Sequence, residues 1–322
     1  GKSGQFPLHT WLPDAMAGPT PVSSLLHSST MVVAGVFLVA RIYPVFWEGF
    51  NIGTGALSFI AVIGAITIII AALLAFVQDD IKKVLAYSTV SQLGYMMLGL
   101  GTGAWLPAVF HIVTHAFFKC CLFLCAGSVS HSGSHHSFDM KKDMGGLRKK
   151  MPITFTAWIV STLALTGVFP FAGFWSKDEI IDNVGHNGYT FLMWVALFGA
   201  ALTAMYMTRA TYLTFFGEPR GAAAGEHGGH ESDELAEEHE LEELTVGAPE
   251  PRSLGAAANA HVDDHHDDHG GHADDHGGHD DHAGPHESGP LILVPIVILA
   301  FFAVFAGFAN PTPLASRFGE GI

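Results

Sequence analysis

Seven long apolar stretches restrict what this sequence can fold into. They cover residues 22–46, 55–77, 84–102, 104–128, 152–175, 189–216 and 290–309. About 20 apolar residues in a helix cross the hydrocarbon core of a bilayer, which is roughly 30 Å thick. Helices satisfy their own backbone hydrogen bonds in lipid, so each stretch predicts a helix and not an isolated strand. The sequence therefore predicts an all-α, polytopic transmembrane helical bundle.

The charges are few and unevenly placed. Only 14% of residues are charged and 49% are hydrophobic, whereas soluble domains carry about 25% charged residues. Most of the 30 acidic residues lie at 217–289. The loops 78–83, 129–151 and 217–289 lie on one side of the predicted spans and carry nine Lys and Arg residues, against two on the other side. The positive-inside rule therefore assigns these three loops to the cytoplasm.

The acidic segment 217–289 is rich in His, Asp and Gly, and DDHGGH occurs at 267–272 and again at 274–279. It has too few apolar residues to form a core, which predicts a disordered cytoplasmic linker. Loose metal buffering is the alternative, because imidazole and carboxylate groups bind Zn²⁺ or Ni²⁺. The histidines concerned are His261, His265, His266, His269, His272 and His276.

Ionisable residues inside apolar stretches are costly and indicate function. His111, His115 and Lys119 are spaced by four and share one face of a predicted helix. His27 lies among serines and a threonine in the first stretch, and hydroxyl groups relay protons through ordered water. We predict that these residues form a proton path, the alternative being histidines and a lysine that only pair with neighbouring helices.

Two lysines lie close in sequence to residues that break helices. Pro170, between Gly167 and Gly173, predicts a break in the fifth stretch. Ser176 and Glu179 form a capping-box pattern, which predicts that a second helix starts there and that Lys177 lies at the junction. Lys2 likewise precedes prolines at 7, 13, 19 and 21.

These two segments predict an inverted internal repeat, a common plan for transporters. Asp14 and Asp178 are the predicted counter-charges of the lysines. The predicted organisation is the end of a first repeat at 1–54, a second repeat at 55–216, the linker at 217–289, and a last span with the start of a following segment at 290–322.

Five ordered motifs carry a resemblance to a known family. They are GKSGQFPLHTWLPDAMAGPTPVSSLLHSSTMV, DDIKKVLAYSTVSQLGYMMLGLG, FHIVTHAFFKCCLFLCAGSV, GGLRKKMP and GFWSKDEI. Together they resemble the antiporter-like subunit L family of bacterial NADH-quinone oxidoreductase, respiratory complex I. The resemblance implies an antiporter-like fold with discontinuous helices in the bacterial inner membrane. It also implies that the sequence is a piece of a longer polypeptide, with the family's paired glutamate upstream and its lateral helix beyond Ile322.

The resemblance further implies residue roles. Lys2 matches the lysine of a broken helix, His27 a central-axis histidine, and Lys177 the exit-side lysine. His111, His115 and Lys119 match the residues of a central water chain. The implied function is proton translocation driven by redox chemistry in other subunits, which would hold FMN, Fe–S clusters and quinone. The implied partners are membrane subunits, chiefly an adjacent antiporter-like subunit, together with lipid and no nucleic acid.

The chain's own residues agree with the absence of a redox cofactor, because no CxxC pair and no glycine-rich nucleotide motif is present. The alternatives are a large subunit of a multi-subunit Na⁺/H⁺ antiporter or of a membrane-bound hydrogenase. The antiporter versions typically carry a lysine close to Val33, which favours the oxidoreductase.

Overall fold

The structure is a computed structural model that describes residues 1–52, 57–225 and 284–309. It confirms the all-α prediction for these residues, with one short antiparallel pairing of β1 (Asn51–Ile52) and β2 (Leu57–Ser58). The helices are α1 (Trp11–Asp14), α2 (Thr20–Ser28), α3 (Val33–Arg41), α4 (Tyr43–Gly49), α5 (Phe59–Val77), α6 (Ile81–Gly101), α7 (Trp105–Gly133), α8 (Pro152–Thr166), α9 (Ala172–His186), α10 (Thr190–Phe215) and α12 (Pro290–Phe305). Short 3₁₀ turns are η1 (Ala15–Ala17), η2 (Leu147–Lys149), η3 (Gly221–Ala224) and η4 (Ala306–Ala309).

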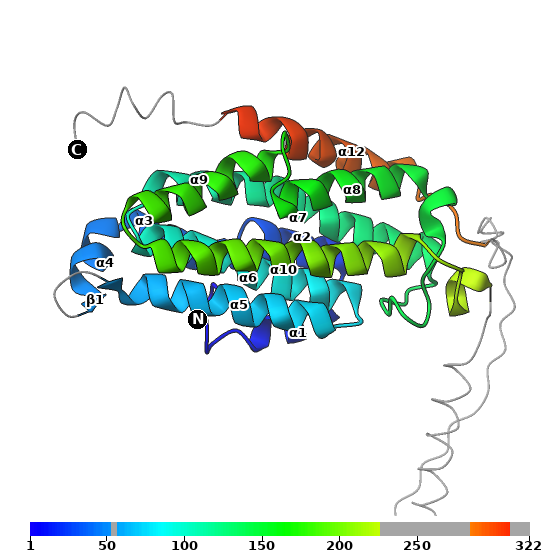
Figure 1. Ribbon diagram of the computed structural model, residues 1–322. Coiled ribbons are helices and arrows are strands. Elements are labelled where there is room, and N and C mark those ends of the chain that lie inside the picture. Colours follow the sequence, from blue (N-terminus) through cyan, green and yellow to red (C-terminus); the bar gives the residue numbers. More distant parts are fainter. Residues whose placement is uncertain (53–56, 226–283, 310–322) are drawn as a thin grey trace, which may run out of the picture. The chain divides into compact units, whose positions relative to one another are not determined.

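Five helical segments in the described part of the chain are long and apolar enough to cross a membrane. They are Thr20–Arg41, Phe59–Val77, Trp105–Gly133, Thr190–Phe215 and Pro290–Ala309. The predicted stretch 84–102 forms α6, which is about 31 Å long at 1.5 Å per residue but carries many small and polar side chains. Nearly all of α6 is buried, because α5, α7, α9 and α10 pack around it (Figure 1).

The helix α6 begins at a side-chain cap and packs closely on α5. The carboxylate of Asp80 accepts from the backbone N–H groups of Lys82 and Lys83 at 2.7 and 3.0 Å, which satisfies two donors of the first turn. A Cβ atom at Gly64 of α5 would lie 2.6 Å from the nitrogen of Leu98 and 2.8 Å from the carbonyl oxygen of Gly94. The two backbones approach closely because glycine occupies both sides of the contact.

We expect Gly64→Leu to destabilise the bundle, because the new side chain meets α6 backbone atoms that cannot move aside. Overpacking costs about 1–3 kcal/mol, which corresponds to a fall in Tm of about 5 °C. The measurement is thermal unfolding in detergent. Gly49→Leu is the control, since a Cβ there has no heavy atom within 4 Å, and equal Tm values for the two variants would contradict the close contact.

The break predicted in the stretch 152–175 is present, but its details differ from the prediction. The helix α8 ends at Thr166, Gly167 adopts a φ of 82°, and α9 begins at Ala172. The left-handed conformation of Gly167 suits a helix C-terminus. The predicted capping box is wrong, because Ser176 lies inside α9 and Phe171 occupies the N-cap position.

A charged cluster joins three segments at the basic end of the bundle. Asp79, between α5 and α6, accepts from Arg209 of α10 at 2.5 Å and from Lys141 at 2.9 Å. Hydrogen bonds from Lys141 and Arg209 lower the pKa of the Asp79 carboxyl group below its usual value. The cluster therefore ties the α5–α6 connection to α10 and to the segment after α7.

Both ends of the predicted linker pack on the helices, so the linker boundaries at 217 and 289 need correction. Arg220 donates to the carbonyl oxygens of Met144 and Leu213 at 2.8 Å each. Glu287 accepts from the backbone N–H of Ile153 at 2.8 Å, at the first turn of α8. The stretch between these ends, with the six predicted metal-ligand histidines, lies outside the described residues.

The range 55–216 contains α5 to α10, with the break between α8 and α9. That these helices form one repeat of five spans, of which one is broken, stays a prediction. The inverted relation of this range to a preceding repeat stays a prediction.

Candidate functional site

The face of α7 that carries His111, His115 and Lys119 lies inside the protein, and all three side chains are fully buried. The helices α2, α6, α8 and α9 pack against α7. The four-residue spacing places the three groups in a row that rises about 6 Å per step. The sequence predicted this shared face, and the structure shows which side chains lie opposite it.

Lys119 is held by α6. Its Nζ atom donates to the carbonyl oxygen of Leu85 at 3.2 Å and to Oγ of Ser88 at 2.7 Å. The Ser88 hydroxyl also accepts from the Tyr206 hydroxyl of α10 at 2.7 Å. A lysine amine has two hydrogens and an ammonium has three, so both protonation states can make the two bonds from Nζ.

His115 has one partner and one free ring nitrogen. Its Nδ1 lies 2.9 Å from the carbonyl oxygen of Ser28, at the end of α2. A carbonyl oxygen only accepts, so Nδ1 carries the hydrogen and Nε2 of a neutral ring presents a lone pair. That Nε2 is buried and has no hydrogen-bond partner among the described residues.

His111 connects α6, α7 and α9. Its Nε2 lies 3.2 Å from Oε1 of Gln92, and its Nδ1 lies 2.8 Å from Oγ of Ser176. The amide oxygen accepts, so Nε2 carries the hydrogen and Nδ1 accepts from the serine hydroxyl. Ser176 also lies 2.7 Å from the Thr114 hydroxyl, which gives a short hydroxyl relay beside the imidazole.

Lys177 lies against the α8–α9 break and is only 2% exposed. Its Nζ stands 4.5 Å from the centre of the Tyr95 ring and has no hydrogen-bond partner among the described residues. A Cβ at Gly167, in the break, would lie 3.8 Å from Cδ of Lys177. Asp178 is exposed, so the structure does not place it as the direct counter-charge that the sequence predicted.

The remaining predicted residues differ in their placement. His27 is fully buried on α2, its ring lies 6.2 Å from that of Phe123, and both ring nitrogens lack a partner among the described residues. Lys2 and Asp14 are exposed. The structure therefore places His27 in the interior and does not bring Lys2 or Asp14 into the buried row.

Several polar residues of the site were missed by the sequence analysis. Ser88, Gln92 and Tyr95 lie on one face of α6 and contact Lys119, His111 and Lys177 in turn. These three residues are four and three positions apart in sequence, a spacing that predicts one shared helix face and could have identified them. Seven residues together are called the buried polar row from here on: Ser88, Gln92, Tyr95, His111, His115, Lys119 and Lys177.

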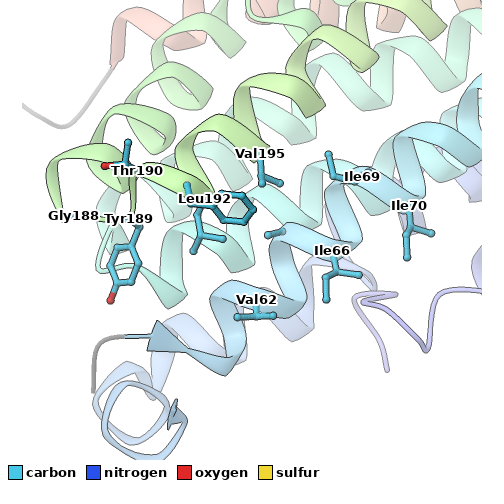
Figure 2. A pocket seen from close by; sticks show the side chains of 11 residues that line it. Val62, Ile66, Ile69, Ile70, Gly188, Tyr189, Thr190, Leu192 and Val195 are labelled. Carbon is cyan, nitrogen blue, oxygen red and sulfur yellow. The ribbon is translucent and has the colours of Figure 1, made fainter. Parts of the chain in front are cut away.

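A cavity of about 750 Å³ lies elsewhere, between α5 and the start of α10 (Figure 2). Val62, Ile66, Leu192 and Val195 line it, and no member of the buried polar row does. Its lining is mostly apolar and contains no Lys, His, Asp or Glu side chain. In the described part of the chain no group of three or more His, Cys, Asp or Glu side chains is arranged to hold a metal ion.

Comparisons with known proteins agree with this architecture. Residues 1–203 match the family model described as NADH:quinone oxidoreductase/Mrp antiporter, TM. The chain is 52% identical over 226 residues to NAD(P)H-quinone oxidoreductase chain 5 of Synechocystis sp., covering 68% of this chain and 32% of that protein. It is 49% identical over 243 residues to NADH-quinone oxidoreductase subunit L of Rhodobacter capsulatus, covering 72% and 33%. This chain thus spans about a third of the length of these relatives.

Two solved structures share the fold. A chain of the archaeal membrane-bound sulfane sulfur reductase, a respiratory membrane complex, superimposes with a TM-score of 0.69 at 26% identity, over 95% of this chain and 42% of that one. A chain of the Mrp complex from Dietzia sp. gives a TM-score of 0.69 at 21% identity, over 97% and 55%. The second likeness concerns the fold alone.

Proposed function

The chain belongs to the NADH:quinone oxidoreductase/Mrp antiporter transmembrane family, and on that premise we propose that it conducts protons within an NADH-quinone oxidoreductase. The observation that carries the proposal is the buried polar row, in which Lys177, His111 and Lys119 follow one another through the interior. Relatives named as oxidoreductase subunits L and chain 5 support the choice of complex.

The proposed path uses groups that both take up and release protons. A neutral imidazole donates from one ring nitrogen and accepts at the other, so His111 and His115 pass a proton along the row. Lys119 and Lys177 store it, because burial disfavours the charged amine and a nearby change in charge loads or unloads it. The proton travels from Lys119 by the two histidines to Lys177 at the helix break.

Unpaired polar atoms support a path that contains water. Nζ of Lys177, Nε2 of His115 and the two ring nitrogens of His27 are buried and have no hydrogen-bond partner in the described part of the chain. An unsatisfied buried group costs about 1–3 kcal/mol, whereas an ordered water molecule satisfies it. Water molecules that join these atoms would complete the row and include His27 in it.

The second candidate is an Na⁺/H⁺ antiporter subunit, which is favoured by the family description and by the fold of the Mrp complex. The chemistry of the buried polar row argues for protons. Hard cations bind oxygen ligands, while the four basic members of the row, His111, His115, Lys119 and Lys177, offer amine and imidazole nitrogens. A lysine ammonium would also repel Na⁺.

The setting of the chain is part of the proposal. The basic end, with Lys83, Lys141 and Arg148 exposed, faces the cytoplasm of a bacterial inner membrane by the positive-inside rule. Other membrane subunits, chiefly an adjacent antiporter-like subunit, are the partners. FMN, Fe–S clusters and quinone would lie in other subunits and supply the energy.

The test is proton pumping by the intact complex that contains this chain, reconstituted in proteoliposomes and driven by NADH and a quinone. We expect acidification of the lumen at the same rate in Na⁺-free buffer as in buffer with Na⁺. A requirement for Na⁺, or loss of pumping after a sodium ionophore, would favour the antiporter function instead.

A further inference from the structure

Lys82, in the first turn of α6, is buried where its neighbour is not. It is 3% exposed, whereas Lys83 lies at the surface. Its Nζ donates to the carbonyl oxygen of Gly18 at 2.8 Å and stands 4.5 Å from the centre of the Phe138 ring. A lysine that ends in the interior at a membrane boundary is unusual, because its long chain normally reaches water.

Lys82 lines a second cavity, of about 750 Å³, between the start of α2, the end of α7 and the start of α12. Ser128, Ser130, His131 and His136 line the same cavity. The two histidines are exposed while the two serines are buried. The cavity thus leads from the surface to a buried lysine, past groups that exchange hydrogen bonds with water.

Lys82 lies on the same helix, α6, as the two groups that accept hydrogen bonds from Lys119. Lys82 and Leu85 are three residues apart, as are Leu85 and Ser88, so the residues of each pair are neighbours on the helix surface. Leu85 and Ser88 are the two partners of Lys119. The helix rise between Lys82 and Ser88 is about 9 Å, a gap that two or three water molecules span.

We propose that this cavity is a cytoplasmic proton-uptake vestibule and that Lys82 passes protons from it to Lys119. The proposal rests on the proposed function and adds an entrance for protons that does not involve Lys2. The Lys82 ammonium gives up one proton, which moves through water to the Lys119 amine. Lys119 becomes an ammonium, and the Lys82 amine regains a proton from hydronium in the cavity, which leaves water.

The first experiment compares Lys82→Met, Lys82→Arg and the matched control Lys83→Met in the reconstituted complex. We expect Lys82→Met to lower the pumping rate at least about tenfold, since a positioned proton carrier contributes about 10²–10⁴. Lys82→Arg keeps a cation and donors for the Gly18 carbonyl but releases no proton, so it should not restore pumping. Lys83→Met should pump normally.

The outcomes separate the roles of Lys82. Quinone reduction reports that each variant complex is assembled. Full pumping by Lys82→Met would overturn the proposal. Full pumping by Lys82→Arg would also overturn it, because it would show that position 82 needs only a positive charge and no exchangeable proton. Loss of pumping in Lys119→Met together with normal pumping in Lys82→Met rejects the vestibule and leaves the proposed function standing. Normal pumping in Lys119→Met rejects the proposed function.

The second experiment asks whether water reaches the cavity. Ser130→Cys places a thiol on its buried wall, and we expect a charged, membrane-impermeant thiol reagent to label it from the cytoplasmic side and to slow pumping. The parent chain, with Cys120, Cys121 and Cys125, gives the background. A thiol that stays unlabelled, as in a cavity closed by lipid, would contradict a water-filled vestibule.

Discussion

We expect Lys177→Met to lower proton pumping about 100-fold or more, while the complex continues to reduce quinone. Methionine keeps the length and most of the volume of the lysine, so the packing against Gly167 and Tyr95 changes little. What is lost is the buried amine at the α8–α9 break, the last titratable side chain of the proposed row. Pumping is measured as lumen acidification for each NADH oxidised in proteoliposomes.

The matched control for Lys177→Met is Lys142→Met, which removes an exposed lysine and should pump normally. Lys177→Arg separates charge from proton exchange, since its guanidinium stays protonated. We expect it to pump as poorly as the methionine variant. A Lys177→Met complex that pumps at the parent rate would exclude this residue as a proton carrier.

Lys119→Met should stop pumping to a similar extent, by about 100-fold, and should also lower stability. The variant leaves the Leu85 carbonyl and the Ser88 hydroxyl without the donor that they share. The Leu85 carbonyl still accepts from the Thr89 hydroxyl at 2.9 Å, so the cost is that of two lost hydrogen bonds, about 1–3 kcal/mol, which thermal unfolding in detergent records separately from pumping. Tyr206 still donates to Ser88, so that hydroxyl keeps one partner.

Ser88→Ala is the companion of Lys119→Met. It removes one hydrogen bond of Lys119 and keeps the amine, so we expect a similar loss of stability with a much smaller loss of pumping. If the two variants lose pumping equally, the effect of Lys119→Met reflects packing. Because the two lysines act in series, the double variant Lys119→Met with Lys177→Met should pump no worse than either single variant.

The sequence was sufficient for the features that depend on neighbours along the chain. Long apolar stretches predicted helices, and the spacing of His111, His115 and Lys119 predicted their shared face. The break near Pro170 was also predicted, because proline and glycine weaken any helix. The residue that caps α9 was not predicted, because the start of α9 depends on how Gly173 fits against the carbonyl of Ala164 on another helix.

The tertiary structure alone decided which groups the row contacts. His111 meets Ser176, which is 65 residues away in sequence, and Tyr206 meets Ser88 across 118 residues. The sequence placed Lys82 and Lys83 together in a cytoplasmic loop. In the structure Gly18 and Phe138 pack against Lys82 and bury it, while Lys83 stays exposed. Helical periodicity is a local property of the backbone and can be read from spacing. Partners across helices depend on how side chains of separate helices interlock, and no local pattern records that.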